Sequence, residues 1–211
     1  MPSDPESLDL KAYEADMRHL IDTYIEADEP RKISPFDNMG LLDLIVKTGI
    51  ANAIASQLGG LKGNKNAVAE TIENNVRKKI IKEHLNDPAY YEKMSALLDE
   101  IIAARKAKTI EYEEYLKRIA ELAKRVEAGH TDDTPAQLDT PGRRALYNNL
   151  GHNEELALAI DQTVKRVRPD DWRDNDGPKK KLIKHALLPL LNNDPAEVER
   201  IFLIIKAQKE Y

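Results

Sequence analysis

At Asp87-Pro88, Thr134-Pro135, Thr140-Pro141 and Asp194-Pro195, a residue that can cap a helix stands directly before a proline. The side-chain oxygen of such an Asp or Thr accepts a free backbone N–H. The proline then takes the first helical position, where its missing N–H costs nothing. Gly177-Pro178 is a weaker form of the same signal. These dipeptides predict repeated helix starts, which a mostly β protein would not contain.

Between these points the apolar residues recur with the period of an α-helix. Such rows are Tyr13, Met17, Leu20, Ile21 and Tyr24; Val68, Ile72, Val76 and Ile80; Met94, Leu97, Leu98, Ile101 and Ile102; Tyr112, Leu116, Ile119, Ala123 and Val126; and Val198, Ile201, Phe202 and Ile205. The segment LLDLIV at 41–46 could form a strand, but the residues after it favour a helix. Aromatic residues make up only 5% of the chain, which also favours helices over a β-sandwich. We therefore predict an all-α protein.

The main break in composition is the polar stretch EAGHTDDTPAQLDTPG, residues 127–142, which contains glycines and prolines. We place the boundary between two helical regions there. A helical, bundle-like region is expected over residues 1–128, a linker over 129–139, and a smaller C-terminal helical module over 140–211.

The composition excludes several classes of protein. The chain has no cysteine, so disulfides and thiolate chemistry are ruled out. Its apolar runs, such as ALLPLL at 186–191, are too short to span a membrane, and its first residues lack the apolar core of a signal peptide. We expect a cytoplasmic protein without a membrane partner. The first 30 residues carry a net charge of −7 within a total of −5, so the remainder is slightly basic and a local DNA contact is compatible with it.

No catalytic motif is present. The stretch GGLKGNKN at 59–66 does not match a phosphate-binding loop, and the five histidines form no metal-ligand pair at helical spacing. The segment GHTDD at 129–133 allows one alternative, a small metal-dependent hydrolase built on His130 with Asp132 or Asp133. A solvated linker is the preferred interpretation of that segment, and we expect no cofactor in this chain.

Two basic stretches are candidate binding surfaces for nucleic acid or a partner protein. The first surrounds the single tryptophan in RPDDWRDNDGPKKK and consists of Lys165, Arg166, Arg168, Trp172, Arg173, Lys179, Lys180, Lys181 and Lys184. The second is the face formed by Arg77, Lys78 and Lys82, with Ile80 and Ile81 expected to turn inward. We expect Trp172 to pack rather than to stack on a base, and the acids around it to belong to a capped loop. Whether the arginines and lysines face DNA or a partner subunit stays open at this point.

Several segments resemble one known family. YEADMRHLIDTYIEAD (13–28), AVAETIENNVRKKI (67–80) and DPAYYEKMSALLDEII (87–102) are similar to the region after the helicase core in R subunits of type I restriction–modification enzymes. RALYNNLG (144–151), RPDDWR (168–173) and IFLIIKAQKEY (201–211) are similar to the C-terminal end of the same subunit. The resemblance runs from about residue 9 to the last residue, and the segments occur in the family's order.

This resemblance implies a function in assembly. The R subunit carries a nuclease domain and two RecA-like motor domains, whose motifs are absent here, so the chain is expected to be a C-terminal fragment with an artificial start at MPSD. ATP, Mg²⁺ and DNA cleavage are expected only of the full-length subunit. The expected partners are the methyltransferase and specificity subunits, the motor domains of the same subunit, and double-stranded DNA as an auxiliary contact. The alternative is a pure protein-interaction module without DNA contact.

Overall fold

All regular structure in the described part of the chain is helical. The computed structural model describes residues 39–61, 63–131, 133–173 and 177–211, and these contain no strand, which confirms the all-α prediction. The predicted row from Tyr13 to Tyr24 and the first segment of the family resemblance lie outside the described residues, as does Asp132. None of the described helices combines the length and apolar character needed to cross a membrane.

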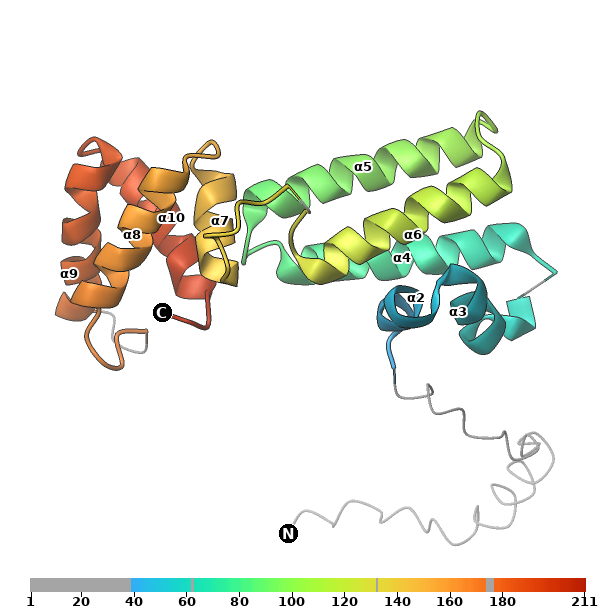
Figure 1. Cartoon of the computed structure of the whole chain (residues 1–211), viewed down its shortest axis with the longest axis horizontal. Coiled ribbons are helices and arrows are strands. Elements are labelled where there is room, and N and C mark those ends of the chain that lie inside the picture. Colours follow the sequence, from blue (N-terminus) through green and yellow to red (C-terminus); the bar gives the residue numbers. More distant parts are fainter. Residues whose placement is uncertain (1–38, 62, 132, 174–176) are drawn as a thin grey trace, which may run out of the picture. The chain divides into compact units, whose positions relative to one another are not determined.

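The first group of helices, called the bundle below, is built around three long helices that lie side by side (Figure 1). The short α2 packs against α4 and α6. Residues 41–46, the one candidate strand, are therefore helical. The elements are α2 (Leu41–Thr48), α3 (Ile50–Gln57), the 3₁₀ helix η2 (Gly59–Leu61), α4 (Lys65–Glu83), α5 (Pro88–Lys106) and α6 (Tyr112–Ala128).

Local sequence explains where the long helices begin and end. The Asn64 side chain caps α4, and the Asp87 side chain caps α5 by accepting the Tyr90 N–H at 3.2 Å. Gly129 ends α6 with a φ of 69°, a conformation that glycine adopts at little cost. The buried row of α6 is turned slightly from the predicted one. Its members are Tyr115, Ile119, Leu122, Ala123 and Val126, whereas Tyr112 and Leu116 are half-buried.

The second group of helices, called the module below, has its own apolar core. It consists of α7 (Pro141–Asn149), α8 (Glu154–Val167), α9 (Pro178–Leu187), the 3₁₀ helix η3 (Leu188–Leu191) and α10 (Pro195–Ala207), followed by residues 208–211, called the tail. The core includes the predicted row of α10 together with Leu146, Ile160 and Trp172. Thr140 and Asp194 cap α7 and α10, and α9 begins at Pro178, as predicted.

The Thr134-Pro135 pair does not begin a helix, so that prediction was wrong. Residues 133–140 form turns, in which the Leu138 N–H donates to the Pro135 carbonyl at 2.9 Å and the Leu138 side chain is buried. The physical reason is the second proline, Pro141. A residue before proline is pushed towards extended backbone, and Thr140 has φ −108° and ψ 153°. Too few residues separate the two prolines for a helix to form between them.

Each group of helices holds a carboxylate within its own core and surrounds it with donors, apart from Asp87, which is buried at the start of α5. In the bundle, the Glu73 carboxylate accepts from Arg105 Nε at 2.8 Å and from the Tyr115 hydroxyl at 3.1 Å. In the module, Asp161 accepts from Arg143 Nε at 2.9 Å and from the Tyr211 hydroxyl at 2.8 Å, and Lys165 Nζ lies 2.7 Å from it. Burial alone would raise the pKa of Asp161, but these hydrogen bonds outweigh it and lower the pKa below its usual range. Asp161 therefore stays ionised in the core.

Candidate interaction site

The tryptophan of the first basic stretch is part of the module core. Trp172 is 3% exposed, and its ring packs against Phe202 with the ring centroids 5.6 Å apart. Its indole N–H has no hydrogen-bond partner among the described residues. The indole therefore packs and does not present a face for stacking on a base.

The two arginines beside Trp172 bind the chain's own tail. Arg168 donates to the Glu210 carbonyl at 2.9 Å, and Arg173 donates to the Gln208 carbonyl. On the other side, the Thr140 hydroxyl donates to the Glu210 carboxylate at 2.8 Å. Gly142 lies directly beneath, where a Cβ atom would clash with the side chains of Glu210 and Tyr211. The loop around Trp172 and the start of α7 together hold the tail in place.

The lysines of this stretch differ in their surroundings. Lys165 pairs with Asp161, Lys179 donates to the Asp170 carbonyl at 2.6 Å, and Lys184 lies 2.5 Å from the Glu199 carboxylate. Arg166 and Lys181 are exposed and make no ion pair with any described residue. The structure thus separates the predicted set into cations that hold the module together and a smaller number that face solvent.

The second basic face differs from the prediction at one position. Arg77 forms an ion pair with Asp99 at 2.6 Å, while Lys78 and Lys82 are exposed. Ile80 is buried, but Ile81 is 68% exposed, so its predicted inward orientation was wrong. Ile80 continues the buried row of α4, and the next residue lies about 100° further around the helix, where neither α5 nor α6 covers it.

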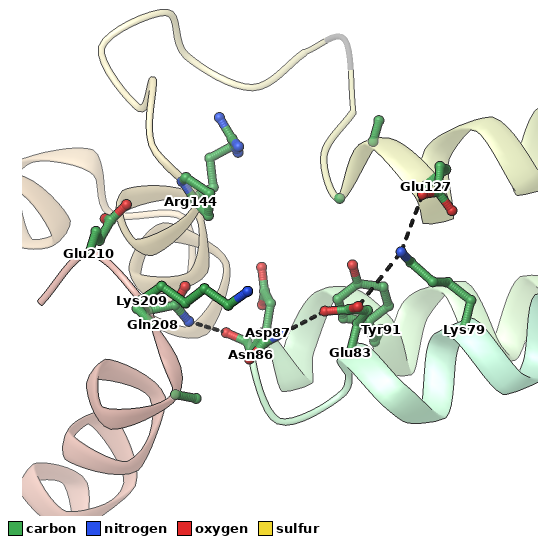
Figure 2. A pocket seen from close by; sticks show the side chains of 14 residues that line it. Lys79, Glu83, Asn86, Asp87, Tyr91, Glu127, Arg144, Gln208, Lys209 and Glu210 are labelled. Atoms are coloured by element: carbon green, nitrogen blue, oxygen red, sulfur yellow. Dashed lines mark hydrogen bonds and ion pairs between the residues drawn. The ribbon is translucent and has the colours of Figure 1, made fainter. Parts of the chain in front are cut away.

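The bundle and the module meet through a set of hydrogen bonds that we call the junction. Asp87 accepts from the side-chain amides of Asn148 at 2.6 Å and Asn149 at 2.7 Å. Asn149 also accepts from the Ala89 N–H at 3.3 Å. From the tail, Gln208 Nε2 donates to the Asn86 carbonyl at 2.5 Å (Figure 2). The start of α5 is thereby joined both to α7 and to the tail.

Asp87 is buried at the junction with amide donors and without a cation at hydrogen-bonding distance. Burial raises its pKa to about 6, although the hydrogen bonds from Asn148, the Tyr90 N–H and Asn149 and the charge of Arg144 act in the opposite direction. This contrasts with Asp161, whose donors include two cations. The pKa of the junction acid is consequently closer to neutral pH than that of Asp161.

A polar hollow of about 480 Å³ lies beside the junction (Figure 2). Lys79 bridges two of the acids that line it, lying 3.6 Å from Glu83 and 3.3 Å from Glu127. Arg144, on the opposite side, donates to the carbonyls of Leu138 and Asp139. Lys79 and its two carboxylates thus satisfy one another and hold α4 to α6, whereas Arg144 is held only by neutral carbonyls and its Nε has no hydrogen-bond partner among the described residues.

The alternative metal site receives no support from the geometry. His130 Nδ1 lies 3.0 Å from the Ala128 carbonyl, and a hydrogen bond from the Thr131 side chain lowers the pKa of the exposed Asp133. Asp132 lies outside the described residues. Within the described ranges, no three His, Asp or Glu side chains are grouped as metal ligands.

Comparison with known proteins gives no match to this chain: no family model, no curated protein and no solved structure corresponds to it.

Proposed function

We propose that this chain is the C-terminal assembly region of an R subunit of a type I restriction–modification enzyme, and that it docks the motor subunit onto the methyltransferase–specificity complex. The observation that carries the proposal is the convergence of three segments that resemble the C-terminal end of that subunit. RALYNNLG supplies Asn148 and Asn149 at the junction. RPDDWR supplies the two arginines that bind the tail, and IFLIIKAQKEY supplies the tail itself.

An assembly function fits how these residues are used. The segments that give the resemblance contribute Trp172 and Phe202 to a core and Asn149 and Gln208 to the junction. Catalysis, with ATP and Mg²⁺, would belong to the nuclease and motor domains of the full-length subunit, acting in the cytoplasm on double-stranded DNA.

We assign DNA an auxiliary role. Trp172, Arg168 and Arg173 have partners within the module, which favours the alternative of a pure protein-interaction module. A weak phosphate contact would have to use exposed cations without ion pairs among the described residues, namely Arg166 and Lys181 of the first stretch and Lys78 and Lys82 of the second.

Co-purification of the chain with the methyltransferase–specificity complex tests the docking proposal. We expect a stable complex, and failure of the two to associate at micromolar concentration would overturn the proposal. Titration with duplex DNA at two salt concentrations tests the auxiliary contact, because phosphate contacts release counterions and weaken as salt rises. Arg166→Glu/Lys181→Glu should weaken this binding, with Lys117→Glu/Lys124→Glu on α6 as a charge-matched control. Equal salt-dependent binding by the double variant and the wild type would assign the contact to other cations, such as Lys78 and Lys82, and absence of salt-dependent binding by the wild type would leave the protein-interaction alternative.

A further inference from the structure

The bundle and the module do not share an apolar core. The buried apolar residues of the module core, and the partly buried ones packed against it, all lie between Leu138 and Tyr211. Where the two groups meet, the buried side chains of Asp87, Asn149 and Gln208 are polar. The hydrogen bonds of the junction, and not a continuous apolar core, therefore join the two groups.

The contact between the two groups is flanked by hollows that both of them line. The polar hollow of about 480 Å³ has Glu83 on the bundle side and Arg144 on the module side (Figure 2). A second hollow of about 720 Å³ lies between Leu85 of the bundle and Leu203 of the module. Across the contact α5 packs against α7. A contact with so little buried apolar surface opens at a lower free energy than the two cores unfold.

The hydrogen bonds around Asp87 suit both of its protonation states. Its Oδ1 accepts from the Tyr90 N–H at 3.2 Å and from Asn149 at 2.7 Å, and its Oδ2 accepts from Asn148 at 2.6 Å. The orientation of the Asn149 amide is fixed, because its oxygen accepts from the Ala89 N–H. The Asn148 amide makes no other hydrogen bond with a described residue, so it can turn over and accept from a protonated Oδ2. The junction can therefore hold Asp87 with or without a proton.

The ionised form of Asp87 is the costly one while the junction is closed. Burial raises its pKa to about 6, even though the charge of Arg144 on α7 acts in the opposite direction. Tyr90 and Tyr91, on α5 itself, stay neutral because burial raises their pKa values. The charged groups that line the polar hollow together with Asp87 come from α4, α6, α7 and the tail, and they are Lys79, Glu83, Glu127, Arg144, Lys209 and Glu210. Opening the junction would return the carboxylate to water and remove the cost of burial.

We propose that the junction is a pH-sensitive hinge, which protonation of Asp87 closes and ionisation of Asp87 loosens, while the bundle and the module each stay folded. The direction follows from linkage, because the closed state holds the proton more tightly than an open state in which the pKa returns to its ordinary value of 3.8. The ratio of closed to open molecules should therefore fall about tenfold between pH 5 and pH 8.

One backbone amide reports opening of the hinge directly. The Ala89 N–H lies in the first turn of α5, where the helix supplies no acceptor, and it donates across the junction to Asn149 Oδ1 at 3.3 Å. The Leu156 N–H is the matched control, because it donates at 3.0 Å to Asn153, the cap of its own helix. Hydrogen exchange of both amides is measured by NMR on the full chain between pH 5 and pH 8, and each rate is divided by that of a free amide at the same pH. We expect this quotient to rise about tenfold for Ala89 and to stay constant for Leu156.

Variants identify the group that titrates. Asp87→Asn still caps α5 but carries no charge at any pH, so the pH dependence at Ala89 should disappear. Asp194→Asn, at an exposed cap of α10, should leave it unchanged. Asn148→Ala keeps the acid and removes a hydrogen bond that favours its ionised form, so the midpoint of the Ala89 profile should move to higher pH. This second variant tests the hinge even if Asp87→Asn does not fold.

The hinge is overturned if the Ala89 quotient is constant with pH in the wild type, if its pH dependence persists in Asp87→Asn, or if Asn148→Ala leaves the midpoint where it was. Ile119 and Ile160 lie fully buried in the two cores, so their amides distinguish separation from unfolding. An equal rise with pH at these amides would mean that the whole chain unfolds, which also overturns the proposal. Opening is a property of the chain alone, so its observation requires neither the methyltransferase–specificity complex nor DNA.

Discussion

The bundle and the module each stabilise a buried carboxylate, but they do so with different parts of the chain. Each meets a buried carboxylate with an arginine and a tyrosine hydroxyl. In the bundle, the three groups come from the consecutive helices α4, α5 and α6. In the module, the tyrosine is Tyr211 in the tail, which reaches back to Asp161. The module's core carboxylate is therefore satisfied in part by the tail, in addition to Arg143 and Lys165, whereas the bundle's is satisfied by neighbouring helices alone.

The largest expected effect is that of alanine at Asp161 and Glu73, the acids buried within the two cores. Asp161→Ala leaves the buried Tyr211 hydroxyl without an acceptor and removes the counter-charge of Arg143 and Lys165, so we expect a loss of about 4 kcal/mol of unfolding free energy. Glu73→Ala should cost about 2 kcal/mol, because the Tyr115 hydroxyl retains the Ala69 carbonyl at 3.3 Å. Urea unfolding at pH 7 measures both, and equal losses would contradict the contrast.

The junction acid should respond to pH in the opposite sense to the module acid. Burial raises the pKa of Asp87 from 3.8 to about 6, so the folded state holds this proton more tightly than the unfolded state. Its contribution to stability therefore falls as pH rises through that window, by up to about 3 kcal/mol relative to Asp87→Asn. Asp161 has a lowered pKa, so the stability it contributes is present at neutral pH and is lost as pH falls through the acidic range below its unfolded value.

Unfolding of Asp87→Asn and Asp161→Asn at about pH 2, pH 4 and pH 7 compares the two acids, because the window of Asp87 lies between the last two and that of Asp161 between the first two. Asp194→Asn is the matched control, because Asp194 also caps a helix but is exposed. A pH dependence of the same sign for Asp87→Asn and Asp161→Asn would refute the assignment.

Removing the two tyrosine hydroxyls gives a smaller and more selective effect. Tyr115→Phe and Tyr211→Phe each delete a hydrogen bond to a carboxylate, so each should cost about 1.5 kcal/mol. Tyr115 is held within α6, whereas Tyr211 belongs to a tail outside any helix. Only Tyr211→Phe should accelerate amide hydrogen exchange in residues 208–211. Similar acceleration in Tyr115→Phe would show that the packing of the tail depends on the core of the bundle.

The smallest effects are expected at exposed ion pairs. Asp99→Asn breaks the pair with Arg77 on the bundle, and Glu199→Gln breaks the pair with Lys184 on the module. Because solvent screens such pairs, each substitution should change the unfolding free energy by less than about 0.5 kcal/mol. A loss of unfolding free energy above about 1 kcal/mol at either site would mean that the ion pair belongs to a larger network of charged side chains.

The helices were predictable because their signals are local. Asp87 and Asp194 act within three residues of their own positions, and the buried row of α10 follows from its period alone. Thr134 also stands directly before a proline, but Pro141 a few residues later prevents a helix. A capping rule that considers one proline at a time does not include that effect.

The binding partners of the charged residues were not predictable in the same way. Arg168 and Arg173 read as a basic patch because nothing near them in the sequence indicates that the carbonyls of the tail will lie against them. Gln208 joins Asn86 across 122 residues, and no periodicity relates the two. Packing of Trp172 was foreseen, but its contact with Phe202 depends on how α10 lies against the loop. Side-chain chemistry limits what such residues can bind, and the tertiary fold selects the partner.

The single tryptophan allows unfolding of the module to be followed separately from unfolding of the helices as a whole. Trp172 is buried in the module core, so its fluorescence should report loss of that core, while the circular dichroism of the helices reports both groups together. Coincident transitions by the two probes would mean that the bundle and the module unfold as one cooperative unit. An earlier fluorescence transition in Tyr211→Phe would show that release of the tail uncouples the module from the bundle.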